Sequence, residues 1–277
     1  MDFSSYLIVS DMDGTLLNRE SCIPERSLDA IRRFVAGGGS FTVATGRPHV
    51  ILDAIPTPEV LLTAPAILVN GAYLYDFRKG AALFEECIPA ETAAELLAFA
   101  REDCEDIPFR VATLQTALRT ATPYGLMLHD MEIYTDKNVR ILPCGEWALD
   151  DWQKIVFRAE PEVLARVRAK AEMRFSDRLD IFLTGPRLLE MQVKGCSKAK
   201  GIDKLRGAMG IDNLTVIACG DFENDIEMLR AADIAVAPAN AIEDVKAAAD
   251  CVLCDCNDGL IADVIEKIEA GTLQKKA

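Results

Sequence analysis

Short apolar runs that end abruptly in polar loops recur along the first part of the chain. Runs of this length, bounded by turn-forming residues, are typical of buried strands. The runs cover residues 6–9, 41–44 and 66–69, and the loops that follow them begin at Ser10, Thr45 and Asn70. We therefore expect three strands here, each ending in a polar loop.

A helix is expected between the first two of these strands. Leu28, Ile31 and Phe34 recur at helical spacing after Pro24, and the glycine run 37–39 closes the segment. Proline at a helix start and glycine just past its end are the usual boundary signals. The order of strand, helix and strand predicts a βα unit.

The same alternation returns late in the chain. Residues 215–218, 234–237 and 251–253 are strand candidates, and residues 223–232 are a helix candidate between the first two. Strands rich in Ile, Val and Ala that alternate with helices indicate a parallel sheet covered on both faces. We predict an α/β fold with a doubly wound, Rossmann-like core. Such sheets bind ligands beyond the carboxyl ends of their strands, so the polar loops should converge on one crevice.

The middle of the chain has a different pattern of predicted elements. Helix candidates at residues 91–101 and 161–172 are mixed with strand candidates at residues 109–113, 154–157 and 179–183. This mixture predicts an inserted α+β domain. We place the core at residues 1–83 and 190–277 and the insertion at residues 84–189, with the two connections able to act as a hinge.

Composition and charge narrow the class of protein. The chain has 277 residues, half of them hydrophobic, and a formal net charge of −14. That composition is typical of a folded protein, and the negative charge argues against a nucleic-acid partner or an anionic membrane. No apolar run approaches the ~20 residues that span a bilayer, and no basic segment precedes the first run. We expect a cytoplasmic protein, and nothing in the pattern indicates its oligomeric state.

The nine cysteines are scattered except for Cys251, Cys254 and Cys256. A metal site or a redox pair is one interpretation of this cluster. However, a zinc site would need a second ligand cluster at suitable spacing, and the odd, irregular count favours reduced thiols. We interpret the cluster as a strand and turn that carry free thiols.

The first polar loop carries two carboxylates, Asp11 and Asp13, followed by Gly14 and Thr15. Alternation would point both acids to the same side if the extended conformation continued past the strand. An isolated Asp-Gly pair is also common in plain turns. The functional interpretation gains weight because residues 220–225 bring further acids to another strand end, while Thr45 and Lys198 add a hydroxyl and a cation.

Several carboxylates in one crevice repel one another unless a cation lies among them. Hard oxygen ligands favour Mg²⁺, which takes one or two carboxylates and shares a substrate phosphate. A magnesium site would also explain how so acidic a protein holds an anionic substrate.

Four segments resemble, in order, the motifs of the haloacid dehalogenase superfamily of phosphohydrolases. They are Asp11-Met12-Asp13-Gly14-Thr15-Leu16-Leu17, Thr45-Gly46-Arg47, Lys198 and Gly220-Asp221-Phe222-Glu223-Asn224-Asp225. The insertion is similar, by position and texture, to the type IIB cap of the Cof-like subfamily. Phe222 departs from the pattern, because a small residue is expected there.

The resemblance implies a role for each matching residue. Asp11 would be the nucleophile that forms an aspartyl-phosphate, and Asp13 the general acid and base. Lys198 would neutralise charge on Asp11 and on the phosphoryl group. Mg²⁺ would bind the Asp11 side chain, the Asp13 carbonyl and Asp221, with support from Asp225. The substrate-binding residues would be Thr45, Gly46, Arg47, Asn70, Lys198 and Asn224, although Asn70-Gly71 could also be a plain turn.

We therefore expect a Mg²⁺-dependent phosphatase of small phosphorylated metabolites, such as sugar phosphates. A phosphotransferase or mutase using the same intermediate is the nearest alternative, and the second acceptor would distinguish them. A ligand-binding regulator on the same fold is a third possibility. The joint presence of Asp11, Asp13 and Lys198 with Asp221 argues against it, since a binder needs no general acid.

Overall fold

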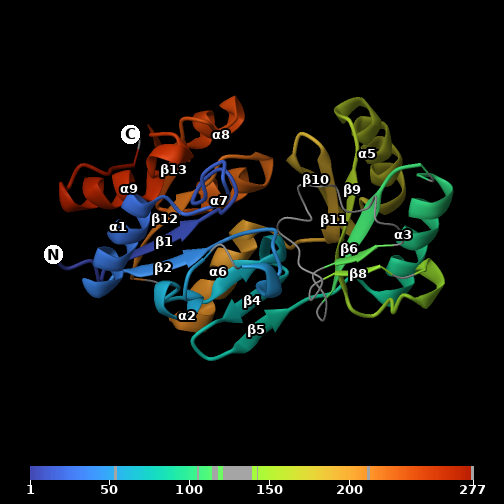
Figure 1. Ribbon diagram of the computed structural model, residues 1–277, viewed down its shortest axis with the longest axis horizontal. Helices are drawn as coiled ribbons and strands as arrows, with labels where there is room; N and C mark the ends of the chain where they lie inside the picture. Colours follow the sequence, from blue (N-terminus) through green and yellow to red (C-terminus); the bar gives the residue numbers. More distant parts are fainter. Residues whose placement is uncertain are drawn as a thin grey trace. The chain divides into compact units, whose positions relative to one another are not determined.

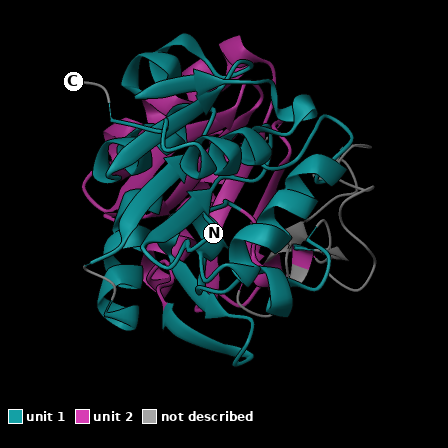
Figure 2. Cartoon of the chain, turned by 90° about the vertical axis from the view of Figure 1, so that its left-hand side faces the viewer, with its two compact units in different colours: residues 1–46, 52–84, 197–277 teal, residues 47–51, 85–196 magenta. Residues whose placement is uncertain are grey.

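The computed structural model describes residues 1–52, 55–104, 106–113, 118–120, 139–141, 143–210 and 213–275. The chain divides into two compact units, coloured separately in Figure 2. The first unit contains Met1–Gly46, Leu52–Phe84 and Ser197–Ala277, and the second contains Arg47–Ile51 and Glu85–Cys196. Each unit has a sheet and a hydrophobic core of its own.

The first unit is built on a five-stranded parallel sheet with the order β14-β13-β12-β1-β2 (Figure 1). The strands are β1 (Tyr6–Ser10), β2 (Ser40–Val43), β12 (Thr215–Cys219), β13 (Ile234–Pro238) and β14 (Cys251–Leu253). Strand β1 pairs with β12 from Tyr6↔Thr215 to Ser10↔Cys219, so segments from the first and last parts of the sequence lie side by side in the sheet.

Helices cover this sheet. Leu7 and Val9 of β1 pack in one cluster with Ile202 of α6 (Lys198–Met209), Met228 of α7 (Ile226–Ala231) and Val245 of α8 (Glu243–Ala248). Ile8 is also fully buried, and strand alternation points it to the opposite face. Helix α1 (Glu25–Ala36) packs against α9 (Leu260–Glu269), β2 and the small helix α2 (Pro58–Leu61). The doubly wound α/β core is thereby confirmed.

A smaller sheet extends the first unit. Strands β3 (Ala66–Leu68), β4 (Tyr73–Asp76) and β5 (Ala81–Glu85) lie in that order, and β3 and β4 are antiparallel. A bridge from Ala44 to Ile67 joins this sheet to the end of β2. The turn between β3 and β4 has positive φ at three successive residues, the last of which is a glycine.

The second unit contains a six-stranded sheet with the order β10-β11-β9-β6-β7-β8. The strands are β6 (Phe109–Thr113), β7 (Leu118–Thr120), β8 (Val139–Ile141), β9 (Trp152–Arg158), β10 (Leu179–Gly185) and β11 (Leu188–Val193). Neighbours pair antiparallel except β7 and β8. Helices α3 (Ala90–Glu102) and α5 (Pro161–Phe175) pack on this sheet, with Phe99 and Phe175 in edge-to-face contact. This unit is of the α+β type and overlaps the insertion predicted at residues 84–189, but it continues to Cys196 and also includes Arg47–Ile51.

Most predicted elements are present, but strand β11 was not predicted. It pairs with both β9 and β10, and it continues past residue 190, where we expected the core to resume. Its sequence includes the charged Glu190, which is buried because it pairs with Lys154 of β9 at 2.7 Å. An ion pair between strands is a tertiary feature, so the local pattern of β11 does not resemble a buried strand.

Candidate active site

The candidate site lies where the strand order reverses. From β1 the chain moves outward to β2, whereas from β12 it moves the other way to β13 and β14. Asp11 follows β1 directly, and Gly220-Asp221 follows β12. The loops after the two central strands diverge at such a point and leave a crevice that doubly wound folds use for ligands.

The loop after β1 is held tightly against β12. The Asp11 amide donates to the Cys219 carbonyl at 2.8 Å, and Thr15 Oγ1 donates to Asp221 Oδ1 at 3.0 Å. Gly14 has a φ of +83°, and a Cβ at this position would lie 2.5 Å from Asp221 Oδ2. Glycine is therefore required both by the backbone conformation and by the close approach of Asp221.

Lys198 is the cation of the site. It is fully buried at the start of α6, and its Nζ lies 2.5 Å from Asp11 Oδ1 and 2.6 Å from Asp225 Oδ1. Ser197 caps this helix by accepting a bond from the Lys200 amide. Burial opposes the charge on Lys198, but the two carboxylates outweigh it and hold the pKa of the ammonium above its ordinary value. Lys198 therefore stays charged.

Asp225 organises the loop after β12. Its Oδ2 accepts hydrogen bonds from the backbone amides of Asp221 and Phe222 at 3.0 and 3.1 Å, while Oδ1 accepts from Lys198. A Cβ on Gly220 would lie 2.4 Å from Asp225 Cβ, so the side chain occupies the space that this glycine leaves. The bulky Phe222 thus contributes its amide to the loop without displacing the acids.

Three carboxylates form a compact cluster. Oxygen atoms of Asp11, Asp221 and Asp225 lie within 4.8 Å of one another. Burial raises the pKa of Asp221 to about 7, and the charge of Asp225 adds to the rise. Burial also raises the pKa of Asp11, against the opposing effect of Lys198. A divalent cation relieves such repulsion, and an all-oxygen donor set suits Mg²⁺, so these residues fit the expected metal.

Asp13 is not one of the three clustered carboxylates, and the condition of the alternation argument, an extended conformation that continues past the strand, is not met. Strand β1 ends at Ser10 and Met12 lies in a turn with its side chain fully buried, so the period of two does not reach Asp13. The Asp13 side chain is exposed. Its charge still contributes to the raised pKa of Asp11.

The loops after β2 and β3 join at Thr45 and Asn70. The Thr45 amide donates to the Ile67 carbonyl, and the Asn70 amide donates to the Thr45 carbonyl at 3.0 Å. Both side chains are buried. Asn224 Nδ2 donates to Asn70 Oδ1 at 3.1 Å and so links this loop to the one after β12. Asn70 is therefore both a turn residue, with a φ of 49°, and a neighbour of the acidic loop.

Arg47 begins a short segment that groups with the second unit. It is 9% exposed and follows directly on Gly46, the last residue of the first stretch of the core. Arg47 is therefore assigned to the second unit, whereas Thr45 and Gly46 belong to the first.

Asn240 was missed by the sequence analysis. Its Nδ2 donates to the Gly14 carbonyl at 2.8 Å, and its Oδ1 accepts from the Cys256 amide at 2.9 Å. It therefore ties the glycine turn of the first loop to the loop that follows β14. The available signal was its position just after the strand predicted at residues 234–237.

The clustered cysteines each have a local partner. The Cys251 thiol donates to the Gln274 carbonyl at 3.6 Å, and the Cys256 thiol donates to Asp255 at 3.7 Å. Burial, together with a hydrogen bond to Asp263, raises the pKa of Cys254 to about 12. A raised thiol pKa disfavours the thiolate that a soft metal or a redox reaction needs.

Comparison with known families agrees with this geometry. The family of haloacid dehalogenase-like hydrolases matches residues 8–265. The chain belongs to this family. This haloacid dehalogenase-like (HAD) hydrolase is similar in sequence to the HMP-PP phosphatase of Serratia proteamaculans, with 30% identity over 87% of this chain and 86% of that protein.

Two further similarities concern length and fold. The hydrolase is 29% identical to a protein of Arabidopsis thaliana named "Endoribonuclease YBEY, chloroplastic" over 93% of this chain but only 45% of that protein, so it spans less than half of that relative. Its fold matches the HAD subclass IIB sugar phosphatase BT4131, with a TM-score of 0.81, 24% identity and coverage of 95% and 99% of the two chains. The predicted family and its IIB-type cap are confirmed.

Proposed function

We propose that this hydrolase is a Mg²⁺-dependent phosphatase that cleaves small phosphorylated metabolites through an aspartyl-phosphate on Asp11. The observation that carries the proposal is the buried Lys198 ammonium held between Asp11 and Asp225, with Asp221 beside them. Phosphate monoesters hydrolyse extremely slowly without a catalyst, so the reaction calls for a nucleophile, a fixed cation and a metal together.

Asp11 is suited to the role of nucleophile. The residue follows a central strand directly and is only 7% exposed. Lys198 donates to Oδ1, which fixes the orientation of the carboxylate and favours its charged form. In the proposed reaction Asp11 attacks phosphorus, the P–O bond to the leaving group breaks, and water later hydrolyses the acyl phosphate.

The proposed metal ligands are the side chains of Asp11 and Asp221 and the backbone carbonyl of Asp13, with Asp225 in a supporting position. When bound, Mg²⁺ neutralises negative charge on the phosphate oxygens. Asp225 already accepts three hydrogen bonds, from Lys198 and from two backbone amides, so its main task is to hold the loop that carries Asp221.

Asp13 is proposed as the general acid and base. Its exposed carboxylate lies outside the compact cluster, so it is accessible to a leaving-group oxygen and to water. It would protonate the departing oxygen and then take a proton from the attacking water.

The proposed phosphate contacts are Lys198, the Thr45 hydroxyl and the amide side chain of Asn224, whose position is set by Asn70. Gly46 and Arg47 complete the set as predictions from the motif. The relatives support a small phosphorylated substrate, because one is named an HMP-PP phosphatase and a structural neighbour a sugar phosphatase. A cytoplasmic location and the absence of nucleic-acid and membrane partners stay part of the proposal.

The test is a panel of phosphorylated metabolites assayed for phosphate release, with Mg²⁺ and with a chelator. We expect release from at least one small phosphate ester only when Mg²⁺ is present. Transfer of phosphate to a sugar hydroxyl in preference to water would instead indicate a phosphotransferase or mutase. Full activity in chelator would contradict the metal assignment.

A further inference from the structure

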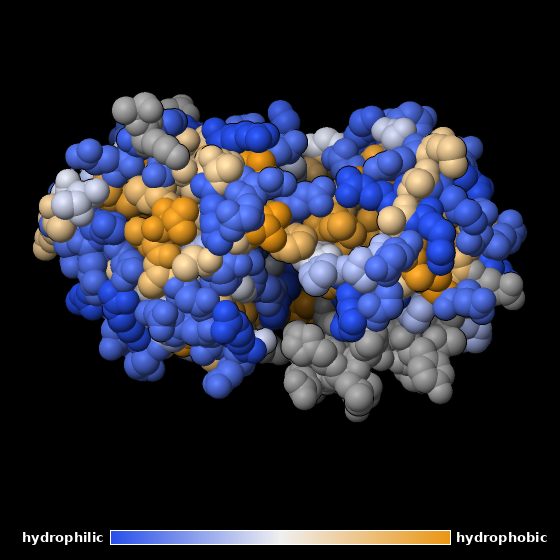
Figure 3. Space-filling view, turned by 90° about the horizontal axis from the view of Figure 1, so that it is seen from above, coloured by the Kyte–Doolittle hydropathy of each residue, from blue (hydrophilic) through white to orange (hydrophobic). Residues whose placement is uncertain are grey.

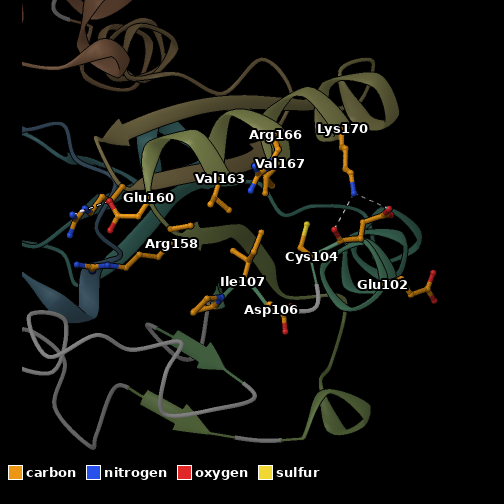
Figure 4. Close-up of a pocket in the computed structure, with 14 residues that line it drawn as sticks. Glu102, Cys104, Asp106, Ile107, Arg158, Glu160, Val163, Arg166, Val167 and Lys170 are labelled. Atoms are coloured by element: carbon orange, nitrogen blue, oxygen red, sulfur yellow. Dashed lines mark hydrogen bonds and ion pairs between the residues drawn. The ribbon is translucent and has the colours of Figure 1, made fainter.

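The second unit contains a cavity that none of the carboxylate-cluster residues lines. Its volume is about 740 Å³, within the range of small-molecule sites. One face of α5 forms a wall, since Val163, Val167 and Lys170 follow at spacings of four and three residues. The other walls come from the end of α3, the segment that enters β6, and the end of β9 (Figure 4).

The middle of the cavity is apolar. Ile107 points toward Val163 and Val167 from the opposite wall, and Cys104 lies beside them (Figure 4). Val167 and Cys104 are each only 3% exposed, so this lining is well packed from behind. A ligand with an apolar body would lose water-exposed surface on both of its sides here.

One end of the cavity is positively charged. Arg158 ends β9, and Arg187 lies beside it because the Ala159 amide donates to the Arg187 carbonyl. Among the described residues that line the cavity, Glu160 is the carboxylate at this end, and it pairs with Arg187 at 3.0 Å. Two guanidinium groups thus lie at this end of the cavity, in a chain whose net charge is −14.

The ion pairs around the cavity are open to exchange. The side chains of Arg187 and Glu160 are 54% and 61% exposed, and the Lys170–Asp103 pair is long, at 3.7 Å. Exposed pairs of this kind contribute little to stability, so an incoming anion can replace Glu160 as the partner of Arg187. Arginine presents a planar fork that matches carboxylate and phosphate groups.

We propose that this cavity binds a small organic anion whose apolar body packs on Ile107, Val163 and Val167 and whose carboxylate or phosphate group pairs with Arg158 and Arg187. The site is separate from the proposed phosphatase chemistry and does not depend on it.

The test is a methyl-detected NMR titration of the full chain in chelator with 3-phenylpropionate and phenylphosphonate, neither of which can be hydrolysed by a phosphatase. The methyl signals of Ile107, Val163 and Val167 should shift with one or both compounds, and the tighter one identifies the preferred anionic group. Inorganic phosphate, which lacks the apolar body, should bind at least tenfold more weakly. Absence of these shifts with both compounds, or shifts of other methyl groups only, overturns the proposal.

Two substitutions with equal charge change separate the site from a general charge effect. Arg187→Glu should weaken binding at least tenfold, whereas Arg168→Glu, on the same unit but outside the cavity lining, should change it less than twofold. Val163→Trp fills the cavity and should abolish the shifts of Ile107 and Val167. Unchanged binding in Arg187→Glu, or equal losses in the two charge variants, would refute the assignment. Unchanged melting temperatures of the variants show that they are folded.

Discussion

At the residue scale, the buried ammonium of Lys198 is the centre of the site. It compensates two carboxylates at 2.5 and 2.6 Å while a third, Asp221, lies beside them. Burial is the main cause of the raised pKa values of Asp11 and Asp221, and the excess negative charge that one cation leaves among three close acids adds to the rise. This excess is what a bound divalent cation would balance.

The two aspartates of the first loop should differ on substitution. Asp11→Asn should abolish turnover of every ester, because an amide oxygen is a far poorer nucleophile than a carboxylate. Asp13→Ala should lose turnover of sugar phosphates, yet with a nitrophenyl ester it should give a burst of phenol and a trapped phosphoenzyme, since an acidic phenol leaves without protonation. Rapid-quench measurements would show both. Neither burst nor phosphoenzyme, in a variant that still binds Mg²⁺, would remove the acid/base role of Asp13.

The raised pKa of Asp221 predicts how the stability of the metal-free protein depends on pH. Burial raises this pKa from 3.8 to about 7, so the folded chain holds a proton that the unfolded chain releases. Stability in chelator should therefore fall as the pH rises through this interval. Urea titrations should show that the free energy of unfolding depends less on pH in Asp221→Asn than in the wild type. An equal pH dependence in the two proteins would contradict the raised pKa of Asp221.

The proton on the Asp221 carboxylate should compete with Mg²⁺ for this group. Below about pH 7 the apparent Kd for Mg²⁺ should rise, by up to about tenfold per pH unit for a single competing proton. Calorimetric titration at several pH values measures this directly. A Kd independent of pH between 5.5 and 7.5 would show that Asp221 is not a ligand that must lose a proton in this range.

At the element scale, the site depends on loops that follow different strands and contact one another closely. Gly14 after β1 lies against Asp221 after β12, and Asn240 after β13 holds the Gly14 carbonyl. Glycine has no side chain, so the two loops can approach to a distance that any other residue would prevent. The position of Asp221 is therefore set by the backbone of the neighbouring loop.

Gly14→Ala tests this close approach. Alanine at a φ of +83° adds strain of about 1–2 kcal/mol, and its Cβ would also displace Asp221. We expect Mg²⁺ affinity to fall at least tenfold. Gly80→Ala is the matched control, because Gly80 also has a positive φ, +63°, but has nothing within 4 Å of the added Cβ. Calorimetry and melting temperatures of both variants separate strain from displacement, and equal effects would contradict the argument.

At the scale of the whole molecule, the net charge is negative and the visible surface is largely hydrophilic. Hydrophilic side chains dominate the face seen in Figure 3, with apolar residues in patches among them. In the described part of the chain, every helix is too short or too polar to traverse a bilayer. With a net charge of −14, the chain needs locally gathered cations to hold an anion, and the proposed sites at Lys198 and at the cavity arginines meet this need.

Metal binding should stabilise the chain as a whole. A ligand at 100 times its Kd adds about 2.7 kcal/mol to the stability of the state that binds it. Mg²⁺ should thus raise the melting temperature of the wild type and have no such effect on Asp221→Ala. The control is Asp29→Ala, an exposed acid paired with Arg32, which should keep the full Mg²⁺-dependent shift. Loss of the shift in the control would point to nonspecific binding by the acidic surface.

The sequence by itself determined the order of the elements and the loops that carry the chemistry. Strand and helix patterns depend on neighbours a few residues apart, so β1, α1, β6 and β13 were predictable nearly to their ends. The resemblance of four motifs also indicated the family, which the match over residues 8–265 bears out.

Only the tertiary structure decided which groups meet and in what electrostatic environment. Thr15 bonds Asp221 across 206 residues of sequence, and Lys198 bonds Asp11 across 187. The exposed position of Asp13, the tie made by Asn240 and the cavity behind α5 all follow from long-range packing. Local periodicity carries no information on such contacts, because their geometry depends on how distant elements pack and on the water that their packing excludes.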